Sequence, residues 1–144
     1  MRYPPHPMSY GQLRSRKLCA EGRFEEAIAA AGAELAATPD EPEAHFNRGQ
    51  ALAGLDRFEE AAADYERALA MDASASALDP EQVDDELFFA LRRLAERRAD
   101  DRAAAVAALG RYLAILPAGR HVEDVPKWID KLDGKETVWV RDRA

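Results

Sequence analysis

The side chains best suited to chemistry in this chain are three histidines and one cysteine, and they lie far apart in the sequence. His6 and His45 have no cysteine or carboxylate at the short spacing of a metal site. The segment His121–Asp124 (HVED) does combine an imidazole with two carboxylates, which is one way to hold a metal. The same segment precedes a predicted helix, where acidic side chains interact favourably with the helix dipole. We favour the helix start over the ligand cluster, and we expect neither a metal nor another cofactor.

Cys19 is the only cysteine, so the chain can form no internal disulfide, and it suits a reducing compartment. Arg16 and Lys17 lie close to it in the sequence and would lower the pKa of its thiol. The alternative, which we favour, is a small core residue. The sequence has no nucleophile elbow, phosphate-binding loop or zinc-ligand spacing. Enzymatic activity is therefore not expected.

The elements that must position these residues are all predicted to be helices, separated by glycine or proline boundaries. Residues 1–8 contain three prolines and read as an extended tail, and Ser9 is a candidate cap for the first helix. The motif Asp79–Gln82 places an aspartate before a proline and a glutamine, which is a helix start. The expected helices cover residues 9–20, 24–37, 42–55, 58–71, 80–98, from Asp100 or Asp101 to 116, and 125–132, followed by a tail over 135–144 in which 137–140 looks extended.

One short motif occurs twice. Gly22–Ala27 (GRFEEA) recurs as Asp56–Ala61 (DRFEEA), at a distance of 34 residues. A fixed period near 34 is typical of a two-helix repeat that stacks on its neighbours to bury a shared core. The third pair of helices is irregular, because about ten residues are inserted around 76–85.

These residues resemble the tetratricopeptide repeat family. The second pair fits the family best, with small or apolar residues at Gly49, Leu52, Ala61, Tyr65 and Ala68. The first pair keeps two family positions and the third pair keeps three, and the following positions carry the resemblance: Ala27, Pro39, Ala105, Leu109 and Pro117.

Other positions depart from the family pattern. His45 and Arg48 stand where the family has tryptophan and leucine, so we expect His45 to pack, partly buried, rather than to contact a ligand. Gly11, Arg14 and Ser15 fit poorly. The resemblance covers residues 9–119, and it implies a right-handed α-solenoid of about three helix-turn-helix repeats, with a C-terminal capping helix over 120–134.

Basic side chains concentrate on the first helix of each pair, whereas the second helices are acidic. The family resemblance implies a concave groove lined by the first helices, so this acidic chain is expected to present a locally basic groove suited to carboxylates. The alternative is a solvated helix face with charge pairs four residues apart. The resemblance and the charge pattern together predict these peptide-binding residues: Gln12, Arg16, Asn47, Gln50, Arg93 and Arg97.

The length, the net charge and the distribution of apolar residues limit the classes of function that this chain can have. The chain has 144 residues and a formal net charge of −7, which argues against binding a nucleic acid. No apolar run suits a membrane span and no secretory signal stands at the start, which favours the cytoplasm. We expect an adaptor or scaffold that binds a protein or peptide, either acidic or with a free C-terminal carboxylate. The alternative is a small structural subunit that docks through its end-faces or its C-terminal helix on a larger complex or a second copy. Exposure of Trp128 and Trp139 would favour this alternative.

Overall fold

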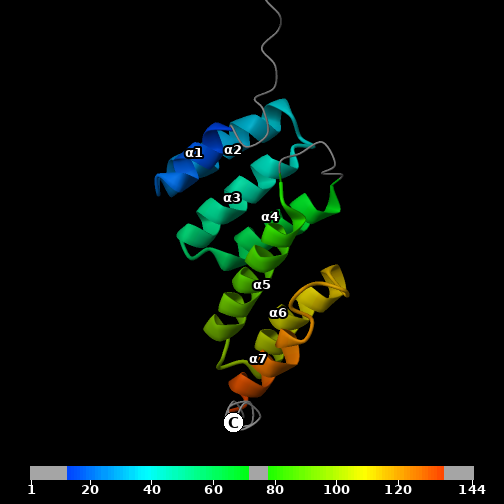
Figure 1. The fold of residues 1–144 in the computed structure, drawn as a ribbon. Coiled ribbons are helices and arrows are strands. Elements are labelled where there is room, and N and C mark those ends of the chain that lie inside the picture. The colour runs from blue at the N-terminus through cyan, green and yellow to red at the C-terminus, as the bar shows by residue number, and fades with distance from the viewer. Residues whose placement is uncertain (1–12, 72–77, 135–144) are drawn as a thin grey trace, which may run out of the picture. The chain divides into compact units, whose positions relative to one another are not determined.

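A computed structural model describes residues 13–71 and 78–134, which form seven α-helices and no strand (Figure 1). The prediction of an all-α helical repeat fold is confirmed. The predicted tails, the cap at Ser9, the residue Gln12 and part of the inserted segment 76–85 lie outside these described residues. The helices are α1 (Arg14–Ala20), α2 (Phe24–Ala37), α3 (Pro42–Gly54), α4 (Phe58–Ala70), α5 (Pro80–Arg97), α6 (Arg102–Ile115) and α7 (Asp124–Leu132).

The predicted boundaries hold within one residue for six of these helices, because local side chains set them. The side chain of Asp79 accepts a hydrogen bond from the backbone N–H of Glu81, and Asp101 accepts one from Ala104. α5 spans 18 residues against 13 in α3, as its early start predicts. The exception is α1, which begins at Arg14 because the backbone of Leu13 is extended.

The helices fall into two compact units, divided between Val83 and Asp84 within α5. In the first unit α2 packs against α1 and α3, and α4 packs against α3 (Figure 1). Leu18, Ala27 and Ala51 form a core cluster there. Ala27 and Ala61 occupy the same position of successive repeats, and both are fully buried. Alanine at this position lets the paired helices approach closely.

The close approach of α3 and α4 depends on Gly49. A β-carbon added there would lie 2.6 Å from Cε1 of Tyr65, so only glycine leaves room for this ring. The ring of Tyr65 also contacts that of Phe46, with centroids 5.6 Å apart. The family pattern of glycine facing a large side chain therefore has a direct packing reason in this chain.

We expect Ala61→Leu to lower the free energy of unfolding by about 1–3 kcal/mol, because a larger side chain overpacks a fully buried helix contact. Urea unfolding measures the change. Ala63→Leu is the matched control, because Ala63 lies on the exposed side of the same helix and should change little. Equal midpoints for the two variants would contradict the assigned repeat register.

In the second unit α6 packs against α7. The face of α5 predicted to be buried, formed by Val83, Leu87, Leu91 and Leu94, is buried. On α6, Ala105 and Leu109 are buried at the positions that the repeat pattern predicts, and Val125 brings α7 into the core. Tyr112 of the third pair stands where the preceding repeat has Ala68.

Candidate functional site

The predicted peptide-binding residues of the first unit are in different surroundings. Arg16 on α1 is the most accessible, with 59% of its side chain exposed, and its guanidinium lies 3.8 Å from the carboxylate of Glu43 on α3. The Glu43 side chain is itself buried, so the neighbourhood of Arg16 is less basic than the sequence suggests. Gln50 on α3 is half-buried. Of the predicted peptide-binding residues that the structure describes in this unit, Arg16 and Gln50 reach the surface.

Asn47 is not on the surface. Its side chain is 2% exposed, and its amide nitrogen donates to the hydroxyl of Ser15 at 3.0 Å. Ser15 in turn donates its hydroxyl and its backbone N–H to Glu34 of α2, at 2.5 and 3.0 Å. Small residues stand at two of these positions in the next repeat, since Ser15 and Glu34 correspond to Gly49 and Ala68. The prediction that Asn47 faces a ligand is therefore corrected: its amide links α1 and α3.

His45 is buried, as its packing role predicts, but it is also paired. Its Nδ1 lies 3.1 Å from the buried carboxylate of Asp64 on α4, and Arg48 holds the same carboxylate with two hydrogen bonds, of 2.8 and 2.9 Å. This Asp64 bond raises the pKa of Arg48. The three side chains thus fasten α3 to α4 where the family has tryptophan and leucine.

Cys19 is not activated. Burial raises the pKa of its thiol to about 11, although Arg16 and Lys17 stand nearby in the sequence. Its Sγ donates to the backbone carbonyl oxygen of Asn47 at 3.1 Å. At neutral pH the thiol stays protonated, so Cys19 is a packing residue, as we favoured.

The predicted binding residues of the second unit lie on α5. Arg93 donates to the carboxylate of Glu96 at 2.8 Å, and Arg92 lies 3.3 Å from the same carboxylate. These pairs, three and four residues apart, are the solvated-face arrangement that the sequence left as the alternative. Arg97, one turn beyond Arg93, is exposed.

A second charged cluster lies between α5, α6 and the connection to α7. Asp84 is buried and accepts hydrogen bonds from the hydroxyl of Tyr112 and from the backbone N–H of Arg120, the latter at 2.9 Å. Burial and the Asp84 hydrogen bond raise the pKa of the Tyr112 phenol, so it remains protonated and donates. The same hydroxyl accepts the backbone N–H of His121 at 2.9 Å. The connection is therefore joined to α5 and α6 by partly buried hydrogen bonds.

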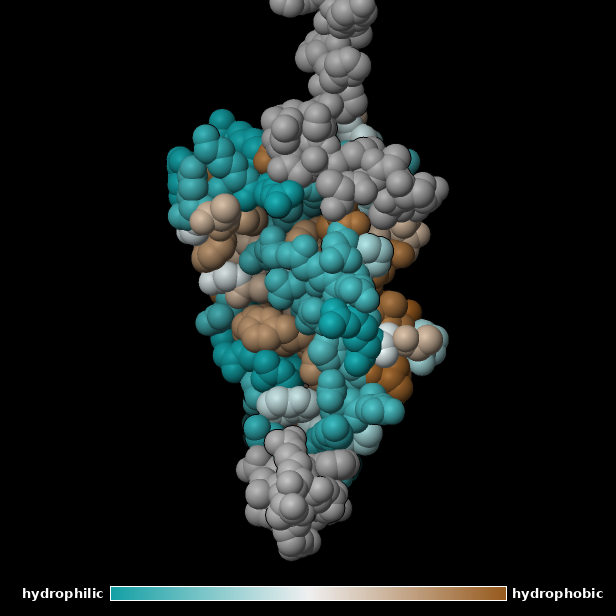
Figure 2. Space-filling model, viewed as in Figure 1, coloured by the Kyte–Doolittle hydropathy of each residue, from teal (hydrophilic) through white to brown (hydrophobic). Residues whose placement is uncertain are grey.

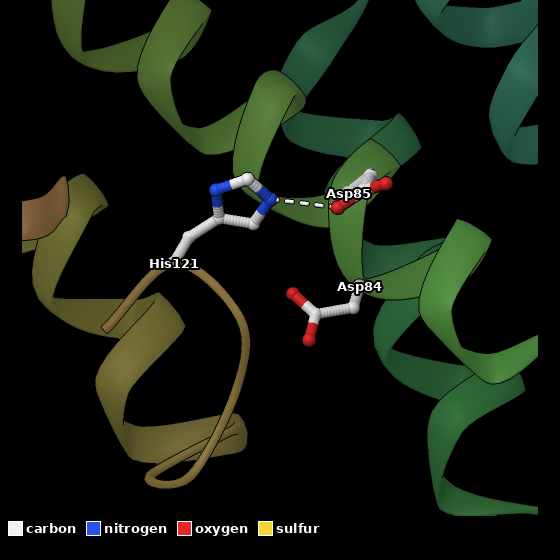
Figure 3. A group of neighbouring side chains, drawn as sticks. All are labelled: Asp84, Asp85 and His121. Atoms are coloured by element: carbon white, nitrogen blue, oxygen red, sulfur yellow. Dashed lines mark hydrogen bonds and ion pairs between the residues drawn. The ribbon is translucent and has the colours of Figure 1, made fainter. Parts of the chain in front are cut away.

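His121 completes this cluster. Its Nε2 lies 2.7 Å from Asp85 of α5 and its Nδ1 lies 2.9 Å from Asp124, the first residue of α7. Figure 3 shows the ring directed from the connection toward Asp85, with the carboxylate of Asp84 below it. The ring stacks on Phe88, with centroids 4.5 Å apart and planes nearly parallel. Asp85 also accepts a hydrogen bond from the side chain of Arg120 at 3.0 Å.

Asp84, Asp85 and His121 form the one group in the described part of the chain with side-chain atoms close enough together to surround a metal ion. Each of these side chains already has a partner, since Tyr112 and the Arg120 backbone bind Asp84, and Arg120 and His121 bind Asp85. The positive charges of Arg120 and of a protonated His121 neutralise the carboxylates, as a bound metal ion would. We therefore interpret the cluster as an ion-paired network that holds the unit together.

Helix α7 contacts both helices of the third pair. The guanidinium of Arg92 lies 4.6 Å from the ring centroid of Trp128, and the ammonium of Lys131 lies 4.2 Å from it. At the end of α7, Asp133 accepts two hydrogen bonds from Arg102 of α6. Trp128 is half-buried by these contacts.

Large apolar side chains are exposed at two places in the second unit. Phe89 on α5 is 39% exposed, and the guanidinium of Arg92 lies 5.3 Å from its ring centroid. Figure 2 shows a brown area over the C-terminal end of α6, the helix on which Leu113 is exposed. None of the helices in the described ranges is long and apolar enough to cross a membrane.

Sequence reasoning missed the polar networks around Ser15, Asp64 and Asp84. Two of these networks could have been suspected from an unusual residue at a repeat position. Glu34 and Tyr112 stand where the second repeat has Ala68. A large or charged residue at a position reserved for a small one needs a compensating partner across the helix pair. That partner is a polar side chain on the facing helix in both cases.

The paired helices α1–α4 and their small buried residues define a helical repeat protein. Residues 15–76 match the tetratricopeptide repeat family, so this part of the chain is similar to tetratricopeptide repeats. Repeats of this family generally mediate contacts between proteins. No curated protein matches the chain, and no solved structure matches it. The third helix pair, α5 and α6, lies beyond the matched range.

Proposed function

We propose that this chain is a non-enzymatic protein-interaction module, an adaptor or scaffold that holds a peptide or a partner helix against the first helices of its pairs. The observation that carries the proposal is the match of residues 15–76 to tetratricopeptide repeats, together with the pairing of α1 with α2 and of α3 with α4. A reducing compartment such as the cytoplasm fits the single, unactivated Cys19.

In the first unit, we assign contact with the partner to Arg16 and Gln50. Arg16 is largely exposed, and its ion pair with Glu43 is long, at 3.8 Å. A guanidinium can hold a carboxylate with two hydrogen bonds, so an acidic segment or a free C-terminus is the partner chemistry that suits this position. In the second unit, Arg93 and Arg97 of α5 would serve the same chemistry, with Arg93 exchanging Glu96 for the partner's carboxylate.

A second candidate function is docking of a small structural subunit on a larger complex or on a second copy. The observation that favours it is the exposure of Phe89 and Leu113 in the second unit. Large apolar side chains exposed on a protein surface often mark a site where another protein docks.

Charge reversal distinguishes the two proposals. We expect Arg16→Glu to weaken binding of the native partner at least about tenfold, because a charge-assisted hydrogen bond is lost and a carboxylate faces a carboxylate. Adding Arg93→Glu should abolish capture, and raising the salt concentration should weaken binding of the unchanged protein. Quantitative pull-down from the source cell, followed by titration of the recovered partner, measures both effects.

Arg67→Glu is the matched control, since Arg67 is an exposed arginine on α4, a second helix of its pair. It changes the net charge equally and should leave binding intact. Retention of the partner by the double variant, with helical content unchanged, would move the binding surface away from the first helices. Loss of binding on Leu113→Glu instead would support docking through the second unit.

A further inference from the structure

His121 lies between two helices of the second unit and contacts a carboxylate from each. Its Nε2 is 2.7 Å from Oδ1 of Asp85 on α5, and its Nδ1 is 2.9 Å from Oδ2 of Asp124 on α7. These distances are those of hydrogen bonds. The imidazole is thus a bridge from the first turn of α7 to α5, and the parallel ring of Phe88 supports it from one face.

Such a bridge requires a proton. An ionised carboxylate only accepts hydrogen bonds, so each ring nitrogen must carry an N–H to bond it. Neutral histidine has one N–H, whereas the imidazolium has two. When the ring is neutral, one of its lone pairs faces a carboxylate oxygen 2.7 or 2.9 Å away. One of the two contacts then becomes repulsive, and the bridge is broken at one end.

The other charged groups around His121 do not replace this proton. From α5, Asp84 is nearby, but its carboxylate is occupied by Tyr112 of α6 and by the Arg120 backbone. Arg120 donates its side chain to Asp85 rather than to Asp124. On α7, Lys127 lies 4.0 Å from Asp124, a long contact between half-exposed groups. Among the described residues, His121 is therefore the side chain that joins Asp124 to α5.

We propose that the attachment of α7 to α5 is proton-linked: protonated His121 holds the first turn of α7, and its deprotonation as the pH rises releases it. The contacts at Trp128 and Asp133 lie further along the chain, so release begins at the N-terminal turn. Val125, buried beside Asp124, becomes exposed in the released state. The second unit would then expose more apolar surface than it does at lower pH.

The direction of the pH effect follows from the surroundings of the ring. Burial lowers the pKa of His121, but the hydrogen bonds that its ring donates to Asp85 and Asp124 outweigh this, and the pKa is raised above its ordinary value. A group whose pKa is raised in the folded state stabilises that state fully below the ordinary value, near 6.5, and loses this stabilisation as the pH rises through the raised value. The closed state of α7 is therefore favoured at mildly acidic pH.

Hydrogen exchange detected by mass spectrometry on the full chain tests this proposal, with rates corrected for the intrinsic pH dependence of exchange. Between about pH 6.5 and the raised pKa, the opening constant of residues 124–132 should rise toward tenfold per pH unit, and then level off. Helix α4 serves as the internal reference, since it belongs to the first unit and should show no such step.

Two variants test whether the proton on His121, rather than another feature of the site, controls the opening of α7. His121→Gln keeps an N–H donor but cannot be charged, so α7 should be open at all these pH values with no step. Asp124→Asn removes one carboxylate, so the step should move to lower pH. An unchanged step in His121→Gln would overturn the proposal. Should that variant fail to fold, an NMR titration of the His121 imidazole in the unchanged protein decides: its midpoint must coincide with the opening of α7, and any other midpoint overturns the proposal.

Discussion

Replacing Asp84 by alanine is expected to lower the free energy of unfolding by about 3 kcal/mol, because a buried hydroxyl and a partly buried backbone N–H lose their acceptor. The hydroxyl of Tyr112 and the backbone N–H of Arg120 both donate to this carboxylate. Tyr112 is fully buried, so water cannot replace the lost bond without opening the contact between α5 and α6. Removing one negative charge beside Asp85 offsets little of this cost, since Asp85 is half-exposed and paired with Arg120.

Urea unfolding of Asp84→Ala, Asp84→Asn and Tyr112→Phe gives this prediction its controls. The Asp84→Asn side chain keeps one oxygen for the Tyr112 hydroxyl but turns a donor toward the Arg120 N–H, so its cost should be about half that of Asp84→Ala. Tyr112→Phe removes the hydroxyl and should cost about 1–2 kcal/mol. A loss below about 1 kcal/mol for Asp84→Ala would show that this network contributes little to the second unit.

The helices could be predicted because local residues determine where they begin and end. Phe24–Ala37 is predicted to the residue, since a glycine turn precedes it and the proline segment 38–42 follows it. The 18-residue α5 follows from the cap at Asp79 and from one apolar stripe. The repeat of 34 residues then predicts which helices pair, because each pair must bury its small positions. Capping and hydrophobic periodicity act over a few residues, which is why a sequence reveals them.

The charged clusters could not be predicted in the same way. Asp85 and His121 are 36 residues apart, and their contact depends on the path of the connection after α6. Asn47 shows a related difficulty. Helical periodicity places it on the face of α3 toward α1, but whether that face meets solvent or Ser15 depends on how closely the helices approach. The serine at position 15, where the next repeat has glycine, provides the hydroxyl that brings the Asn47 amide inside.

The contact between Gly49 and Tyr65 is the part of the family pattern with the largest expected effect on stability. We expect Tyr65→Ala to lower the free energy of unfolding by about 3–5 kcal/mol, because it removes a fully buried ring that fills the space between α3 and α4. Tyr65→Phe keeps the ring and should cost no more than about 1.5 kcal/mol. Thermal and urea unfolding, followed by circular dichroism, measure both changes.

Gly49→Ala provides the sharper test, because whether it stabilises or destabilises the protein should depend on the residue at position 65. In the unchanged protein the added methyl group would lie 2.6 Å from Cε1 of Tyr65, so the ring must shift and stability falls. In the Tyr65→Ala background the ring is gone, and alanine is a better helix former than glycine by about 1 kcal/mol. The second substitution should then stabilise the protein. If Gly49→Ala had the same effect in both backgrounds, the two residues would not be in contact, and the repeat register that pairs α3 with α4 would be wrong.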